Sequence, residues 1–248
     1  MNALILAGSR GGVDPVAAYA GVAHKALIEI GGETLLARVA RALHEAGRAP
    51  VAVSTGDAAV AAEARRLGCR VLQSASGPSA SVAEALETLG APLLVTTADH
   101  ALLEAEWVRR FVADTPRDAD VAVLLARRDL VEAALPGTRR TYLRFADGDW
   151  SGCNLFLLAT LRAAGAIDLW RLVETDRKRP WRIVRRLGPT ALLLYLMGRL
   201  TLGRAVERLG ALSDVRAAAV ASPAGLAAVD VDKPTDLDAV RGVLATRG

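Results

Sequence analysis

The stretch Leu4-Ile5-Leu6-Ala7-Gly8-Ser9-Arg10-Gly11-Gly12 joins an apolar run directly to a glycine-rich loop. The run is apolar throughout, as expected of a strand covered on both faces of a parallel sheet. A loop that follows such a strand lies at the carboxyl edge of the sheet, where ligands bind. Glycines there let backbone N–H groups approach phosphate oxygens. Taken alone, the loop is as consistent with an ordinary connection as with a phosphate site.

Short apolar runs alternate with helical patterns along the rest of the chain. The spacing of apolar residues predicts helices over 34–46, 58–67, 79–89 and 234–244, and strands over 3–7, 50–54, 70–73, 92–97, 120–126, 139–145, 154–158, 217–220 and 227–231. An Asp-Gly turn is expected within 146–149. Apolar strands separated by helices predict an α/β fold: a Rossmann-like three-layer α/β/α sandwich with a mostly parallel, mixed sheet.

Length and composition fit one domain. The chain has 248 residues, 52% of them hydrophobic, which suffices for a large core. Because no linker, repeat or low-complexity tract interrupts it, residues 1–248 are expected to form a single domain. Residues 160–210 are helical in pattern and basic, with a break at Gly188-Pro189. We interpret them as a helical insert and a candidate acceptor subdomain, with a solvated basic helix as the alternative.

Charge and special residues narrow the class of protein. The net charge is +4, and arginines cluster at 139–144 and 177–186, which predicts a local anion site rather than nucleic-acid binding. Cys69 and Cys153 have no C-x-x-C spacing and are expected to be buried thiols, and the three histidines have no zinc spacing. The longest apolar run, 191–197, is too short to span a membrane, and no signal peptide is evident. A cytoplasmic protein is expected.

Acidic residues follow two further apolar segments. Asp99 comes just after the strand predicted over 92–97, so it is expected at the same sheet edge as the glycine loop. Asp230 and Asp232 alternate with apolar residues and so share one face of a strand end. Carboxylates in such places can bind Mg²⁺ between protein and phosphate. The alternative is that these residues only cap the helices that follow.

The glycine loop, the segment with Asp99 and the segment with Asp230 and Asp232 follow one another in this order along the chain. In this they resemble the nucleotidyltransferases of the GT-A-like superfamily, particularly the MobA-like NTP transferases. The similarity lies in Leu4–Gly8 with Arg10, His24-Lys25-Ala26-Leu27, Ser76-Gly77-Pro78-Ser79, Thr97-Ala98-Asp99-His100, Ser151-Gly152-Cys153-Asn154 and Asp230-Val231-Asp232-Lys233-Pro234-Thr235-Asp236-Leu237. It spans nearly the whole chain except 160–210. The sequence departs from the family pattern in the glycine loop and at His24, where proline usually precedes the lysine.

The resemblance implies transfer of a nucleoside monophosphate from an NTP, with CTP or GTP favoured, to a phosphorylated small-molecule acceptor, with release of pyrophosphate. In that scheme the catalytic residues are Lys25, Arg10 and Asp99. The nucleotide-binding residues are Leu6, Ala7, Gly8, Ser9, Gly11, Gly12, Gly77, Pro78 and Ser79. Asn154, Lys178 and Arg179 are assigned to the acceptor. Asp99 and Asp232 are assigned to Mg²⁺, with Asp230 as the alternate ligand.

Two other functions stay open from the sequence. A GT-A glycosyltransferase would use a nucleotide-sugar and release a nucleoside diphosphate, although a loop suited to a triphosphate disfavours it. A non-catalytic nucleotide-binding regulator would fit the irregular glycine loop. The sequence identifies neither the base nor the acceptor, and it leaves monomer and homodimer open.

Overall fold

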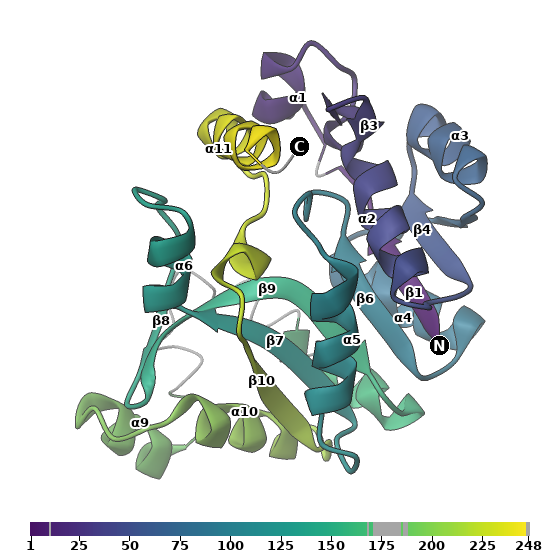
Figure 1. The fold of residues 1–248 in the computed structure, drawn as a ribbon. Helices are drawn as coiled ribbons and strands as arrows, with labels where there is room; N and C mark the ends of the chain where they lie inside the picture. The colour runs from purple at the N-terminus through teal and green to yellow at the C-terminus, as the bar shows by residue number, and fades with distance from the viewer. Residues whose placement is uncertain (10, 168, 171–184, 186–187, 247–248) are drawn as a thin grey trace.

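A mixed β-sheet forms the centre of the molecule (Figure 1). The computed structural model describes residues 1–248 except 10, 168, 171–184, 186–187 and 247–248. The strands follow the order β10-β7-β9-β6-β1-β4-β5, with β8 paired to β9. Their bounds are β1 Asn2–Leu6, β4 Val51–Thr55, β5 Arg70–Gln73, β6 Leu93–Thr97, β7 Val121–Arg127, β8 Leu143–Phe145, β9 Gly148–Leu158 and β10 Ala217–Ser222. Strand β9 is antiparallel to β6, β7 and β8, and the other pairings are parallel.

Helices cover both faces of this sheet. They are α1 Pro15–Tyr19, α2 Leu35–Glu45, α3 Ala58–Arg66, α4 Pro78–Leu89, α5 Ala105–Asp114, α6 Arg128–Ala134, α9 Pro189–Leu196, α10 Leu202–Ala211 and α11 Pro234–Ala245. Short 3₁₀ turns add η1 Lys25–Leu27, η2 Leu161–Ala163 and η3 Gly225–Ala228, and a small hairpin adds β2 Glu29–Ile30 and β3 Glu33–Thr34. Helices α1 and α11 lie side by side at one end of the molecule, and α9 and α10 lie at the other (Figure 1).

The two-residue period of the strands divides the core into layers. In β1, Ala3 and Ile5 join the core under α2, α3, α5 and α11, whereas Leu4 joins the core under α4. Helix α10 covers the α4 face farther along the sheet, where Leu202 packs on Leu125 and Trp150. The three-layer sandwich with a mostly parallel, mixed sheet is therefore confirmed.

Several element predictions need correction. No strand forms over 227–231: the segment is η3 followed by extended chain, and the Val231 N–H donates to the Asp99 carbonyl at 3.1 Å. The strand expected over 139–145 is shorter than predicted, because only β8 forms there. The strand expected over 154–158 is longer, because β9 already begins at Gly148. Between them the Asp-Gly turn is confirmed, and the Asp147 carboxylate accepts the Leu202 N–H that begins α10. Helices α1, α5 and α6 were not predicted.

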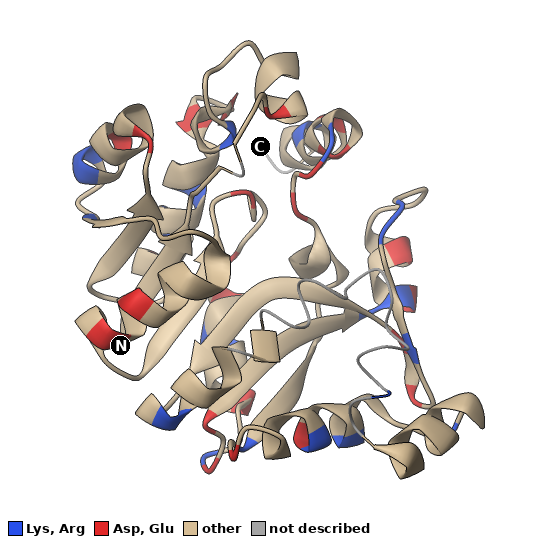
Figure 2. Ribbon diagram, turned by 180° about the vertical axis from the view of Figure 1, so that it is seen from behind, with Lys and Arg blue, Asp and Glu red and all other residues tan. Residues whose placement is uncertain are grey.

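Other expectations concern thiols, charge and membrane spans. Cys69 and Cys153 are buried free thiols, and burial raises the pKa of Cys69 to about 11. Acidic and basic residues are interspersed over the described helices (Figure 2). None of the helices that the structure describes is long and apolar enough to span a membrane.

Candidate active site

The predicted site residues gather where the strand order reverses. From β1 the chain builds β4 and β5 on one side and then crosses to β6 on the other. The loop after β1 and the loop after β6 therefore lie together at the carboxyl edge, the usual ligand position in such sheets. The two loops are joined directly, because the Ala98 N–H donates to the Leu6 carbonyl at 3.0 Å.

Lys25 is the centre of this cluster. Its ammonium lies 2.6 Å from Asp99 Oδ2 and 3.7 Å from Asp232 Oδ1, and its side chain is 21% exposed. Burial by itself would lower the pKa of Lys25, but the charge and hydrogen bond of Asp99, helped by Asp232 and Asp14, raise it. Lys25 therefore stays protonated and carries a positive charge at the sheet edge.

The local backbone explains how Lys25 is presented. Lys25 begins η1, and the buried His24 is the residue before it. His24 Nδ1 accepts the Ala26 N–H at 3.1 Å and so caps this turn. Burial lowers the pKa of His24, which keeps the ring neutral and able to accept. His24 thus supplies a cap at the position where the family usually has proline.

The carboxylates of Asp99 and Asp232 differ in their exposure to solvent. Asp99 is mostly buried, and its Oδ1 accepts the Thr97 hydroxyl at 2.5 Å. Asp232 has a side chain that is 60% exposed. Partial loss of water and the negative charges of Asp230 and Asp99 raise the pKa of Asp232 against the opposing charge of Lys25. The predicted Asp99 and Asp232 are thus brought together across Lys25.

Asp230 is held by a different set of partners. Arg140 donates from Nη2 to its carbonyl at 2.9 Å and from Nη1 to Oδ1, while Asn154 Nδ2 donates to Oδ2 at 2.7 Å. The Arg140 and Asp230 side chains are only 11% and 15% exposed. Asn154 has φ +48°, a conformation that asparagine tolerates better than most residues. Arg140 was not singled out from the sequence, where its only signal is membership of the arginine cluster at 139–144.

The glycine loop lies on the same edge with exposed backbone. Gly11 and Gly12 have φ of +78° and +80°, the left-handed region that glycine adopts freely. Gly8 approaches Ser74, since a Cβ on Gly8 would lie 3.9 Å from Ser74 Cβ. The Ala7 N–H already donates to the Ser54 carbonyl, so it is not available to a ligand. Arg10 lies outside the described residues.

The predicted base-contacting segment begins α4. Gly77 is the residue before the helix, Pro78 is its first residue and Ser79 is buried. Gly77 has an extended backbone (φ −175°) and open space at its Cβ position, so this backbone does not require glycine. Ser74 lies in the loop between β5 and α4, and a Cβ on Gly8 would come within 3.9 Å of its Cβ, so this loop runs near the glycine loop.

Of the residues predicted to bind the acceptor, the structure describes only one. Asn154 belongs to the cluster, whereas Lys178 and Arg179 lie outside the described residues. Helices α9 and α10, the described remainder of the insert, pack on the β8–β9 hairpin through Phe145 and Trp150. Their assignment to the acceptor stays a prediction.

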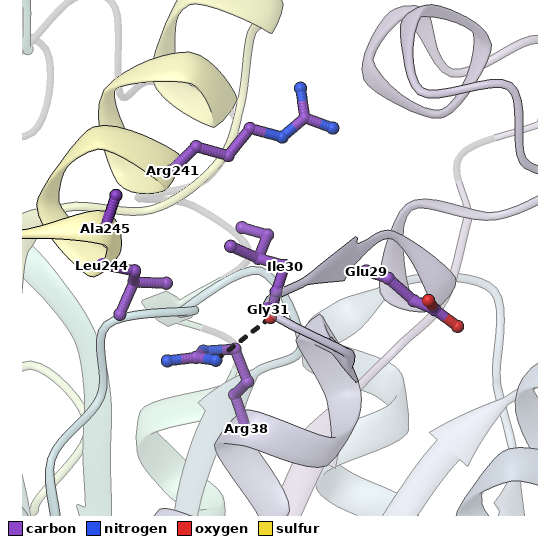
Figure 3. Close-up of a pocket in the computed structure, with 7 residues that line it drawn as sticks. All are labelled: Glu29, Ile30, Gly31, Arg38, Arg241, Leu244 and Ala245. Atoms are coloured by element: carbon purple, nitrogen blue, oxygen red, sulfur yellow. Dashed lines mark hydrogen bonds between the residues drawn. The ribbon is translucent and has the colours of Figure 1, made fainter. Parts of the chain in front are cut away.

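A separate hollow of about 560 Å³ lies between the β2–β3 hairpin and α11 (Figure 3). Arg38 and Arg241 line it together with Ile30 and Leu244. Arg38 donates hydrogen bonds to the Ile30 carbonyl and to Glu33, and Arg241 donates one to Asp238. The two guanidinium groups do not converge in Figure 3, and none of the predicted site residues lines the hollow.

The donor set suits a hard divalent cation, although only in part. No group of three or more His, Cys, Asp or Glu side chains is arranged to hold a metal among the described residues. Mg²⁺ keeps several waters and is commonly bound through one or two carboxylates plus substrate phosphates. Asp99 and Asp232 therefore fit Mg²⁺ that arrives with a triphosphate, but they do not form a complete site by themselves.

Comparison with known proteins agrees with this geometry. Residues 3–166, more than half of the chain, match the MobA-like NTP transferase domain. The chain belongs to this family. It is a nucleotidyltransferase with a Rossmann-like fold, and members of the family generally use a divalent metal.

Solved structures extend the similarity over the whole chain. A structure described as a hypothetical transferase from Thermus thermophilus is 31% identical with a TM-score of 0.78, covering 95% of this chain and 98% of that one. A nucleotidyl transferase from Methanothermobacter thermautotrophicus is 21% identical (TM-score 0.55, covering 100% and 98%). CMP:2-keto-3-deoxy-manno-octonic acid synthetase complexed with CTP is 20% identical (TM-score 0.56, covering 100% of both chains). The last two share the fold. No curated protein matches the chain.

Proposed function

We propose that this nucleotidyltransferase moves a nucleoside monophosphate from an NTP, CTP or GTP, to a phosphorylated small-molecule acceptor. The observation that carries the proposal is Lys25 held between Asp99 and Asp232, beside a glycine loop at the switch point of the sheet. One cation between two carboxylates suits a reaction in which a triphosphate and a second phosphate must meet. Repulsion between these anions is the main obstacle, and fixed charges reduce it.

In the proposed reaction an acceptor phosphate oxygen attacks the α-phosphorus of the NTP. A phosphorus–oxygen bond forms as the bond to the β-phosphate bridging oxygen breaks, and pyrophosphate leaves with that electron pair. No strong base is required, because the attacking phosphate is already anionic. Positioning and charge neutralisation then dominate catalysis, as in other phosphoryl-group transfers.

Each cluster residue has a proposed part in this reaction. Lys25 neutralises charge between the α-phosphate and the acceptor. The free N–H groups of Gly8, Ser9, Gly11 and Gly12 bind the triphosphate, with Arg10 assisting, and the start of α4 contacts the base. Asp99 and Asp232 would hold Mg²⁺, which when bound neutralises charge on the phosphates. Asn154 faces the acceptor.

The test is a matrix of four NTPs and a set of sugar, polyol and cofactor-precursor phosphates, with Mg²⁺ and a pyrophosphate readout. We expect release that requires one NTP and one acceptor together and is lost in Lys25→Ala. Nucleoside diphosphate released from a nucleotide-sugar would favour a glycosyltransferase instead. NTP binding without turnover on any acceptor would favour a regulator.

A further inference from the structure

Lys25 occupies the space between the two carboxylates that are expected to hold the cation. Its ammonium is in hydrogen-bond contact with Asp99 Oδ2 and lies 3.7 Å from Asp232 Oδ1. Thr97 takes the other oxygen of Asp99, so Lys25 blocks the remaining one. A divalent cation that used these two oxygens would compete with the ammonium for them.

The third carboxylate does not offer an alternative position. Both oxygens of Asp230 already accept hydrogen bonds, one from Arg140 and one from Asn154. Asp230 is therefore neutralised from its own side of the site, and Arg140 also binds its carbonyl. The three acids thus divide into Asp230, which Arg140 and Asn154 hold, and a pair that shares Lys25.

We propose that the Lys25 ammonium holds the place of the divalent cation in the empty enzyme and leaves it when the nucleotide binds. This inference rests on the proposed function. The lysine keeps Asp99 and Asp232 close together and neutralised, so the pair needs no metal in order to persist. Its flexible four-carbon stem lets the ammonium move to the phosphates once they arrive. The free enzyme therefore binds divalent cations weakly, and the metal loads together with the NTP.

The alternative is that Lys25 stays on Asp99 throughout and the cation binds beside it. The two arrangements differ in what happens when the lysine charge is removed without nucleotide. If Lys25 competes for the site, its loss frees two carboxylate oxygens and tightens metal binding. If it does not compete, its loss frees no oxygen, and only the effect of removing a nearby charge remains.

The experiment measures Mn²⁺ binding without nucleotide, from the electron paramagnetic resonance signal of free Mn²⁺. We expect Lys25→Met to bind Mn²⁺ at least about tenfold tighter than the wild type. Lys233→Met is the matched control, because it removes the same charge next to Asp232 from an exposed position. That control should change binding by less than about threefold. The double variant Lys25→Met/Asp232→Asn should lose the gain.

Lys25→Ala provides a second variant in case Lys25→Met does not fold, because alanine is also neutral and cannot donate to Asp99. Equal Mn²⁺ affinity in the wild type and the folded Lys25 variant would overturn the inference, as would a gain that survives loss of Asp232. The readout is independent of turnover. Tighter Mn²⁺ binding with no pyrophosphate in any reaction would uphold this inference and defeat the proposed function, whereas pyrophosphate release with unchanged Mn²⁺ affinity would do the reverse.

Discussion

At the scale of single residues, Asp99 has the most constrained side chain of the proposed cation site. Thr97 fixes one of its oxygens and Lys25 the other. We expect Asp99→Asn to lower kcat/KM by about 100-fold or more, because asparagine keeps the shape but removes the charge that neutralises Lys25 and would hold the metal. Pyrophosphate release and thermal unfolding measured together check this. A folded variant with wild-type activity would show that Asp99 has no part in catalysis.

Arg140 gives a prediction about stability, because it is the cation paired with the mostly buried Asp230. Arg140→Met leaves that carboxylate without its charged partner and should lower the free energy of unfolding by about 3–5 kcal/mol. Denaturant unfolding measures this. The double variant Arg140→Met/Asp230→Asn removes the unpaired charge and should recover part of the loss. A single variant as stable as the wild type would mean that the pair contributes little.

At the scale of elements, η3 packs its backbone against α6. A Cβ on Gly225 would lie only 2.0 Å from the Leu130 carbonyl oxygen. Gly225→Ala should therefore destabilise the fold by about 1–3 kcal/mol through overpacking. Gly242→Ala, within α11 and with open space at its Cβ, should stabilise it by about 0.5–1 kcal/mol, since alanine favours helix. Equal unfolding midpoints for the two variants would contradict this contact.

Some helices and strands could be predicted from the sequence, and others could not. Helix α2 followed from its apolar periodicity and the stop at Gly47, and strand β6 followed from a continuous apolar run. The strand expected over 227–231 did not form, although Ala227, Val229 and Val231 are buried as a strand would require. Burial was read correctly, but the hydrogen bond from Val231 goes to the loop carbonyl of Asp99 rather than to a neighbouring strand. A short apolar run does not reveal its backbone partner.

The site itself was predictable in its acids and lysine but not in their pairing. The end of β6 places Asp99 at the carboxyl edge of the sheet. Lys25 reaches it from η1, and Asp232 from the chain that follows η3. The contact between Arg140 and Asp230 joins residues 90 positions apart, and no local pattern encodes it. Nor did the sequence indicate that Lys25 would contact both acids directly.

At the scale of the whole molecule, His100 couples the fold to pH. It is fully buried, and burial lowers its pKa to about 4, against the weaker opposing effects of Asp230 and Asp99. The unfolded chain takes up this proton near pH 6.5, whereas the folded protein does not until about pH 4. Stability is therefore lost as the pH falls through this window, by about 3 kcal/mol for this group.

Unfolding by denaturant at several pH values, for the wild type and His100→Asn, measures that loss. The difference between the two proteins in free energy of unfolding should shift in favour of the variant as the pH falls from 7 to 4.5. Taking the difference cancels the titration of carboxylates that both proteins share. A difference that stays constant across this range would show that His100 is not held neutral.

The topology of the sheet brings the residues of the candidate site together. The sheet reverses its order between β1 and β6, and that reversal brings the glycine loop, Lys25 and two carboxylates to one edge of the sheet. Family membership makes the chain a nucleotidyltransferase. We propose that the group transferred is a nucleoside monophosphate and that its acceptor is a phosphate.

The most direct test is the mass of the acceptor after reaction with the NTP and acceptor pair that gives pyrophosphate. We predict a product heavier than the acceptor by one nucleoside monophosphate residue, with one pyrophosphate released per product and neither formed by Asp99→Asn. An acceptor of unchanged mass, with the NTP converted to nucleoside diphosphate and phosphate, would contradict the account.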